Sequence, residues 1–187
     1  MKLAYLILAH KNPEQVKRLV ELLNGDVYIH VDSKSKLENY YINNTKIHYI
    51  DEMVSITWGG FSMVEATLKL INEAKKNWNY DYYILLSGDD YPIKKLDQFE
   101  SYLNKNRKFS FVEYDKFEEK WEILMPRYQK FKIFQKDYLV YKAVQKILNF
   151  FVNKRCMYRN MQAYKGSQWW CLNSESIEYI LKYIKEN

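Results

Sequence analysis

Short apolar runs alternate with helical patterns along the first hundred residues of the chain. Leu3–Ala9 is a continuous apolar run of strand length, which is typical of a strand covered on both faces of a sheet. Val27–Val31, Lys46–Ile50 and Asp81–Ser87 predict three further strands. Strands that alternate with helices indicate βαβ units. We therefore predict an α/β fold with a mostly parallel central sheet.

Four amphipathic segments predict the helices around this sheet. Asn12–Gln15 predicts a helix start with its asparagine as the N-cap, and Gly25 predicts the end of that helix. Ser62–Glu65 and Leu96–Glu100 predict two further capped starts. Ser174–Lys185 places its isoleucines on one face and predicts a helix near the end of the chain.

The pattern is less regular between residues 109 and 172. Phe109–Val112 and Trp169–Leu172 each predict a short strand, and one helix is expected around Asp137–Val152. The remainder of residues 114–165 is basic and aromatic, and it predicts mostly loop.

Length and composition fit a single globular domain. The chain has 187 residues, of which 48% are hydrophobic, and this is enough for one sizeable core. No run of about 18 apolar residues predicts a membrane span. Lys2 is followed at once by a strand-like segment, so no secretory leader is expected. The two cysteines, Cys156 and Cys171, lack metal-ligand spacing and fit a reducing compartment.

The formal net charge of +6 favours anionic partners. Much of the excess lies between Lys116 and Lys165, where basic and aromatic residues alternate. Such a stretch suits stacking on nucleic-acid bases or contact with an anionic membrane. It is more typical of a solvated amphipathic region whose aromatic side chains face a core. The acidic pair Asp89 and Asp90 argues against nucleic acid as a partner.

Polar clusters follow three of the predicted strands, at Ala9–Lys11, His30–Lys34 and Ser87–Pro92. Ligands of open α/β sheets bind beyond the carboxyl ends of the strands. If the strands are parallel, the three clusters face one cleft. A carboxylate there, such as Asp32, suits the hydroxyl groups of a ribose.

Each cluster also has a second interpretation. His10 is equally consistent with a hydrogen bond within its own loop, and Asp32 followed by Ser33 is typical of a turn. Asp89 and Asp90 suit a divalent cation bound to a diphosphate, but they equally suit an Asx turn before a proline.

Trp58–Ser62 joins a loop to a predicted helix N-terminus. Backbone amides at such a position suit a phosphate, although Gly59-Gly60 is also an ordinary turn. No GxGxxG, Walker, HExxH or Gly-x-Ser-x-Gly motif is present. Hydride transfer, ATP hydrolysis and serine hydrolysis therefore have no support.

Five segments carry a resemblance to a known family: Ala4–Lys11, Tyr28–Lys34, Trp58–Ser62, Tyr82–Lys94 and Gly166–Trp170. In this order and spacing, they resemble the core-2/I-branching β-1,6-N-acetylglucosaminyltransferases. This group is glycosyltransferase family 14, which includes the peptide xylosyltransferases. The lack of a membrane anchor and of several disulfides resembles the bacterial branch of the family.

The resemblance implies a GT-A-like, Rossmann-type three-layer sandwich and an inverting transfer from a UDP-sugar. UDP-N-acetylglucosamine is the expected donor, with UDP-xylose as another candidate. The expected acceptor is a glycan or lipid-linked glycan in cell-surface polysaccharide synthesis, and no metal cofactor is expected. One alternative is a metal-dependent transferase that holds Mg²⁺ or Mn²⁺ on Asp89 and Asp90. Another is a non-catalytic nucleotide-sugar-binding module.

The same resemblance assigns roles to particular residues. The expected donor-binding residues are His10, Asp32, Lys34, Ser87, Gly88, Asp89 and Asp90. The expected acceptor-binding residues are Glu113, Lys120, Trp169 and Trp170. The two tryptophans present apolar faces that suit a pyranose, but they are equally consistent with the core.

The resemblance also predicts the organisation of the chain as one glycosyltransferase domain over residues 1–187. Its nucleotide-sugar-binding part is expected at about 1–112 and its acceptor-side, sheet-completing part at about 113–187. The family's catalytic carboxylate is expected beyond Asn187, in a C-terminal part that is missing here, so we expect weak or absent turnover. The expected location is cytoplasmic, with peripheral contact at the inner face of the cell membrane through the basic residues 127–159.

Overall fold

A computed structural model describes residues 1–116, 125, 128–131, 139–155 and 164–187. The chain forms two units. The first combines Met1–Val112 with Gln168–Asn187, and the second is Glu113–Ser167. The residues after 167 therefore belong to the same unit as the first hundred residues.

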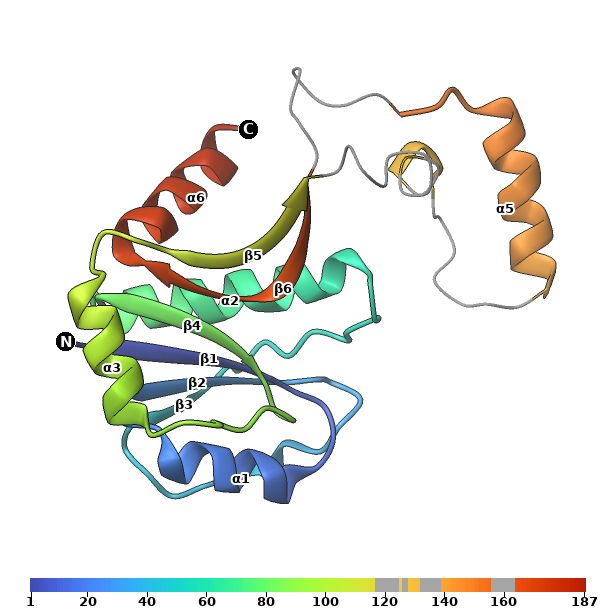
Figure 1. The fold of residues 1–187 in the computed structure, drawn as a ribbon. Coiled ribbons are helices and arrows are strands. Elements are labelled where there is room, and N and C mark those ends of the chain that lie inside the picture. The colour runs from blue at the N-terminus through green and yellow to red at the C-terminus, as the bar shows by residue number, and fades with distance from the viewer. Residues whose placement is uncertain (117–124, 126–127, 132–138, 156–163) are drawn as a thin grey trace. The chain divides into compact units, whose positions relative to one another are not determined.

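A six-stranded sheet with the strand order β3-β2-β1-β4-β6-β5 forms the centre of the fold (Figure 1). The strands are β1 (Leu3–Ala9), β2 (Asp26–Val31), β3 (Ile47–Tyr49), β4 (Tyr82–Ser87), β5 (Phe111–Lys116) and β6 (Tyr164–Asn173). β1 is parallel to β2 and β4, and β2 is parallel to β3, whereas β6 is antiparallel to β4. The predicted α/β fold with a mostly parallel sheet is confirmed.

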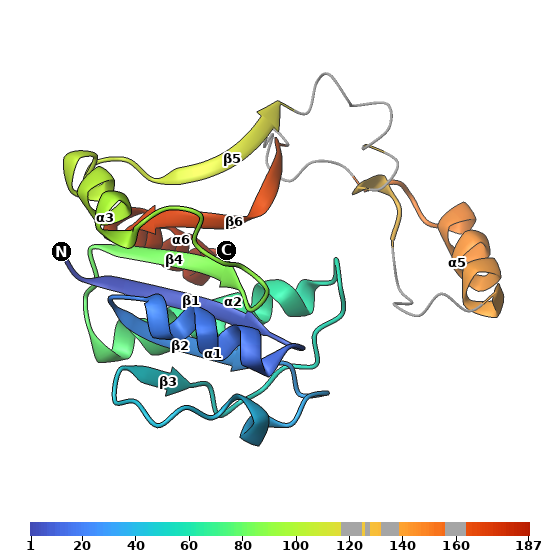
Figure 2. The same ribbon diagram turned by 60° about the horizontal axis from the view of Figure 1, so that its bottom comes forward.

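Helices cover both faces of the sheet and complete a three-layer sandwich. They are α1 (Pro13–Leu22), α2 (Phe61–Asn77), α3 (Leu96–Lys105) and α6 (Ser174–Glu186). Figures 1 and 2 show α1 and α3 on one face, and α2 and α6 on the other. A short 3-10 helix, Leu37–Tyr40, follows β2.

Alternate residues of β1 face the two helix layers. Leu3, Tyr5 and Ile7 belong to a buried cluster with side chains of α1 and α3. Ala4 and Leu6 belong to a second cluster with side chains of α2 and α6. All seven residues of β1 are buried. Because helices cover both faces, the strand is apolar along its whole length, as its sequence predicted.

The predicted helices form, but none of the three predicted side-chain caps does. Asn12 precedes α1 in a left-handed conformation (φ 52°), and its side chain binds Asp89 instead of the helix amides. Ser62 lies inside α2, where its Oγ accepts a hydrogen bond from the Thr57 amide at 2.9 Å. The start of α3 also lacks a side-chain cap. Asn12 thus binds the loop after β4, and Ser62 binds the segment between β3 and α2.

Gly25 does not end α1, contrary to the prediction. The helix ends at Leu22, and Leu23 is its C-cap in an extended conformation. A Cβ atom at Gly25 would lie 2.5 Å from the carbonyl oxygen of Leu3. The glycine is therefore needed where the chain passes close to β1 before it enters β2.

The second unit contains helix α5 (Leu139–Phe151), which lies within the range predicted from the sequence. β6 is longer than predicted and begins at Tyr164. It leads directly into α6, where the Asn173 side chain accepts a hydrogen bond from the Ser176 amide at 3.0 Å. Within the described part of the chain, no helix is long and apolar enough to cross a bilayer.

Candidate functional site

The ends of β1, β2 and β4 lie level with one another at one edge of the sheet. Leu8 of β1 is paired with His30 on β2 and with Ser87 on β4. Beyond this edge lies a pocket of about 440 Å³, which we call the strand-end pocket. Its lining residues are Leu8, Ala9, His10, Lys11, Asp32, Lys34, Ile56, Trp58, Met63, Ser87, Gln168 and Trp169. The parallel sheet thus brings together four of the predicted residues: His10, Asp32, Lys34 and Ser87.

Asp32 is the buried charge of the strand-end pocket, with 4% of its surface exposed. Its Oδ1 accepts a hydrogen bond from the Lys34 amide at 3.0 Å, and its Oδ2 lies 3.2 Å from Lys34 Nζ. Lys34 Nζ also donates to the carbonyl oxygen of Ile56. The turn that the sequence suggested at Asp32 is therefore present, and it fixes the carboxylate in the pocket wall.

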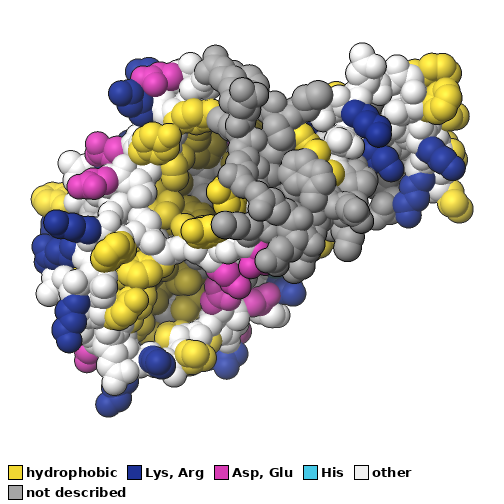
Figure 3. Space-filling model, turned by 45° about the horizontal axis from the view of Figure 1, so that its top comes forward, with side chains coloured by type: hydrophobic (Ala, Val, Ile, Leu, Met, Phe, Trp, Pro, Cys, Tyr) yellow, Lys and Arg dark blue, Asp and Glu magenta, His cyan; other side chains and the backbone are white. Residues whose placement is uncertain are grey.

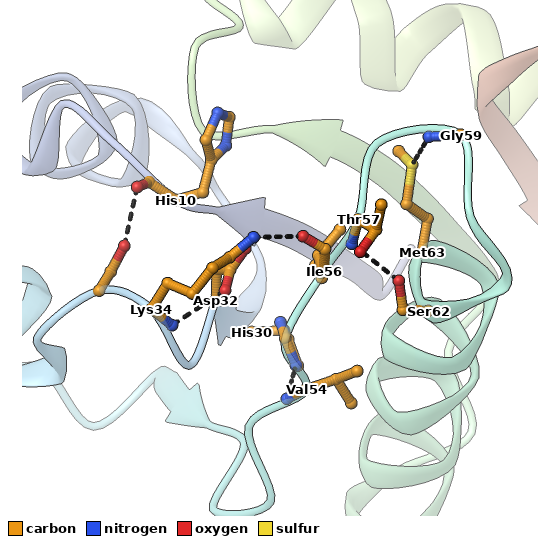
Figure 4. Close-up of polar contacts among 11 residues, drawn as sticks. His10, His30, Asp32, Lys34, Val54, Ile56, Thr57, Gly59, Ser62 and Met63 are labelled. Atoms are coloured by element: carbon orange, nitrogen blue, oxygen red, sulfur yellow. Dashed lines mark hydrogen bonds and ion pairs between the residues drawn. The ribbon is translucent and has the colours of Figure 1, made fainter. Parts of the chain in front are cut away.

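His30 attaches the segment after β3 to the end of β2 (Figure 4). The Val54 amide donates to His30 Nε2 at 2.8 Å. The Ser33 amide donates to the Val54 carbonyl at 3.2 Å. These bonds, together with that from Lys34 to Ile56, place residues 54–58 as a wall of the pocket.

Burial governs the electrostatics of His30, which has no exposed surface. Desolvation lowers its pKa below the ordinary value and outweighs the opposing charge of Asp32. Since Nε2 accepts the Val54 N–H, the proton of the neutral imidazole lies on Nδ1. Nδ1 has no hydrogen-bond partner in the described structure.

His10 contributes differently to the site. Its carbonyl oxygen accepts a hydrogen bond from Ser35 Oγ at 2.8 Å, so the predicted loop contact involves the backbone. The imidazole is exposed, and Figure 4 shows it pointing away from Asp32 and Lys34.

The Trp58–Ser62 segment forms a tight turn before α2. Gly59 has a positive φ of 68°, and its amide donates to Met63 Sδ at 3.2 Å. The Gly60 amide donates to the Thr57 carbonyl at 2.9 Å. Both glycine amides have partners within the turn, which favours the turn interpretation over a phosphate cradle. Trp58 is 89% exposed beside the pocket.

The loop after β4 packs against α1. Asp90 Oδ2 accepts a hydrogen bond from the Ser87 amide, three residues earlier, at 2.8 Å, and the Asp89 amide donates to Ser87 Oγ at 3.2 Å. Asp89 Oδ1 accepts from Asn12 Nδ2 at 3.0 Å, and its Oδ2 lies 3.3 Å from Lys11 Nζ. Gly88, a buried residue of this loop, lies against Val16 of α1. None of Gly88, Asp89 and Asp90 is among the residues that line the strand-end pocket.

The two carboxylates of this loop do not converge on a shared ligand. Asp90 lines a second cavity of about 600 Å³ between α1 and α3, whereas Asp89 binds Lys11 and Asn12. Within the described ranges, no group of three or more His, Cys, Asp or Glu side chains could hold a metal ion. Each carboxylate is instead bonded to protein groups, Asp90 within its own loop and Asp89 to the segment before α1.

β6 supplies the remaining wall of the strand-end pocket. Trp169 lines the pocket and also packs against the core cluster of α2 and α6. Trp170 packs against that cluster and is not a lining residue. Gln168, which the sequence reasoning did not single out, lines the pocket with a buried Nε2 that has no partner in the described structure. Gln168 could have been predicted as a pocket residue from its position next to Trp169 in the segment Gly166–Trp170.

The other predicted residues lie elsewhere. Glu113 is an exposed residue of β5 in the second unit. Lys120 and Cys156 lie outside the described residues. Cys171 is a buried free thiol of β6, and desolvation raises its pKa to about 12. A thiol with so high a pKa is a core residue, not a nucleophile.

Comparison with known proteins gives a family match over nearly the whole chain. A family model described as "Branch: Core-2/I-Branching enzyme" matches residues 3–187. Xylosyltransferase 2 of Rattus norvegicus is 29% identical over 124 residues, and xylosyltransferase oxt of Drosophila melanogaster is 30% identical over 125 residues. Each match covers 60% of this chain but only 14% of the relative.

Solved structures also show a distant likeness, as one example illustrates. It is CMP:2-keto-3-deoxy-manno-octonic acid synthetase complexed with CTP, at 11% identity and a TM-score of 0.45. The alignment covers 97% of this chain and 78% of that one.

Proposed function

The chain belongs to the Core-2/I-Branching enzyme family, and we propose that its strand-end pocket binds the nucleotide-sugar donor of a glycosyl transfer. The observation that carries this proposal is the placement of Asp32 and Lys34 beside Ser87 at the carboxyl edge of parallel strands. A buried carboxylate suits the hydroxyl groups of a ribose, and lysine ammonium groups suit a diphosphate. Among the described residues that line the pocket, Lys11 and Lys34 carry ammonium groups.

For the donor itself, we propose UDP-N-acetylglucosamine. UDP-xylose is the second candidate, because relatives of the chain are named xylosyltransferases. In the proposed reaction, an acceptor hydroxyl oxygen attacks the anomeric carbon of the sugar. The bond from that carbon to the diphosphate oxygen breaks, UDP leaves, and the hydroxyl proton passes to a carboxylate base.

Asp32 does not serve as this base in our proposal. Both of its oxygens are already bonded to Lys34. Among the described residues that line the pocket, Asp32 is the sole carboxylate. The proposal therefore assigns donor binding to the pocket and leaves the base to a carboxylate outside it.

The finer proposals concern the biological setting. We propose a glycan acceptor in cell-surface polysaccharide synthesis, in a bacterial member of the family, at the cytoplasmic side of the membrane. Donor binding without a metal is proposed because Asp89 and Asp90 bind protein donors instead of facing the pocket. The other candidates are metal-dependent binding and a module that binds the nucleotide sugar without transfer.

The test is calorimetric titration of UDP-N-acetylglucosamine into the chain, with Mg²⁺ and again in EDTA. Asp32→Asn is expected to weaken binding about 10- to 100-fold, because hydrogen bonds to a charged group contribute about 1.5–3 kcal/mol. Lys34→Met is expected to weaken it as well, and this side chain is 61% exposed, so its removal leaves the core intact. Asp51→Asn, at an exposed position away from the pocket, is the matched control.

Each outcome has a distinct meaning. Equal affinity in both buffers supports the metal-independent site. Binding with Mg²⁺ alone would transfer the proposal to the metal-dependent candidate with Asp89 and Asp90. Wild-type affinity in both Asp32→Asn and Lys34→Met would contradict the placement of the donor in this pocket.

A further inference from the structure

Helix α5 has one apolar and one polar side along its whole length. Its large apolar residues follow a helical spacing that covers one broad side: Leu139, Val140, Val144, Ile147, Leu148, Phe150 and Phe151. Its polar residues share the opposite side, at Lys142, Gln145, Lys146 and Asn149. In a helix that packs on its own protein, the apolar side normally faces inward.

In α5 the polar side forms hydrogen bonds with other described residues of the chain. Asn149 Oδ1 accepts the Phe131 amide at 2.7 Å, and Asn149 Nδ2 donates to the Phe131 carbonyl at 2.9 Å. Gln145 Nε2 donates to the same carbonyl at 2.5 Å. Just after the helix, Arg155 donates to the Lys130 carbonyl at 2.9 Å. These bonds attach α5 to residues 130–131 through its polar side.

Most of the apolar side is exposed. Leu139 is 87% exposed, Phe150 83% and Phe151 79%. No residue of α5 is buried. Exposed apolar surface of this extent marks an interaction site on a folded protein.

The charge around this apolar side indicates what it binds. The chain contains no Asp or Glu from residue 138 to residue 174. Lys142 and Lys146 lie on the polar side, where Lys146 is next to Phe150 by helical spacing, and Lys154 and Arg155 follow the helix. Figure 3 shows hydrophobic and basic side chains next to each other over α5, at the right-hand end of the view.

We propose that α5 is an interfacial helix that docks the protein on a lipid bilayer with anionic headgroups. Its phenylalanines and aliphatic residues enter the boundary between headgroups and acyl chains, while Lys142 and Lys146 extend toward the headgroup phosphates. A second copy of the chain fits less well, because residues 138–174, which hold basic and no acidic residues, would meet the same positive charge there. This inference does not rest on the proposed donor site.

The experiment is co-sedimentation of the full chain with vesicles of phosphatidylcholine alone or with about one third phosphatidylglycerol. We expect binding to the anionic vesicles, weakened by salt. The double variant Phe150→Ser/Phe151→Ser is expected to lower the partition coefficient about tenfold or more. Lys142→Glu/Lys146→Glu is expected to abolish the preference for anionic lipid.

Two controls make the result specific. Phe109→Ser removes a phenylalanine that is 62% exposed outside α5, and Lys182→Glu/Lys185→Glu reverses two charges on α6. Both are expected to bind as the wild type does. Because the altered side chains of α5 are exposed, all variants should keep the wild-type far-UV circular dichroism and melting temperature.

Several outcomes would overturn the proposal. They are no binding to either vesicle, equal binding to both, or binding that Phe150→Ser/Phe151→Ser leaves unchanged. Concentration-dependent dimerisation that this variant abolishes, without vesicle binding, would assign the face to a second copy. UDP-sugar affinity, measured on the same samples, shows whether the donor site is intact in each case.

Discussion

His30 is the residue on which the geometry of the strand-end pocket depends most directly. It is buried and neutral, and its Nε2 accepts the amide of Val54 from a segment 24 residues away in the chain. The segment that it holds continues into Ile56 and Trp58, which line the pocket. Protonation of Nε2 would replace an acceptor with a donor and break this bond.

Protonation of His30 should make the stability of the folded chain depend on pH. Burial lowers the pKa of His30 in the folded chain, while in the unfolded chain it is about 6.5. The unfolded chain therefore binds more protons below that pH. The free energy of unfolding should fall as pH decreases through about 6.5 toward the folded-state pKa, by up to about 1.4 kcal/mol per pH unit.

Urea unfolding between pH 5 and 8 measures this slope. His30→Gln should flatten it over the acidic part of the range, because the titrating group is gone. If His30→Gln keeps the wild-type slope, the pH dependence comes from other groups.

Gly88 determines how closely the loop after β4 approaches helix α1. A Cβ atom there would lie 2.8 Å from Val16 Cγ2 and 3.4 Å from Ala9 Cα. Val16 is fully buried in α1. Gly88→Ala should therefore destabilise the protein by about 1–3 kcal/mol through overpacking.

A double-mutant cycle in urea isolates this contact. Val16→Ala removes the methyl group that the new Cβ would meet, so the double variant Gly88→Ala/Val16→Ala should be less destabilised than the sum of the two single changes. The coupling should be about 0.5–3 kcal/mol. Strict additivity would mean that the cost of Gly88→Ala arises from the backbone and not from α1.

The elements also show which parts of the fold the sequence could predict. β1 was predictable because burial on both faces requires an unbroken apolar run. The loss of the helix caps could not be predicted, because the partner of the Asn12 side chain is Asp89, 77 residues further along the chain. Gly88, Asp89 and Asp90 were predicted to bind the donor, but they are not among the residues that line the pocket. Their loop packs against α1, and this contact between distant segments could not be predicted from the sequence.

Helix α5 illustrates a different limit. Its periodicity predicted a helix at nearly the observed range. Periodicity alone does not say which side of a helix packs on its own protein. The contacts of Gln145 and Asn149 with Phe131 show that here it is the polar side. The inference of membrane docking therefore needed the structure as well as the sequence.

Buried side chains are distributed unequally between the two units of the molecule. Both core clusters consist of residues of the first unit. Within the described residues of the second unit, α5 contributes no buried side chain. Local opening requires less free energy where few apolar contacts are lost. The two units should therefore differ in the protection of their backbone amides.

Helices α5 and α6 provide a matched comparison, because each has 13 residues. α6 is anchored by the buried Ile177 and by its Asn173 cap, whereas α5 has neither anchor among its described residues. In hydrogen exchange followed by mass spectrometry, α5 should exchange first, α6 later, and β1 and β4 last. Anionic vesicles should slow exchange in α5 and leave β1 unchanged, because lipid would cover the apolar side of α5 alone. If α5 were as protected as α6 without lipid, another surface would already cover its apolar side in solution, and membrane docking would require that surface to be displaced first.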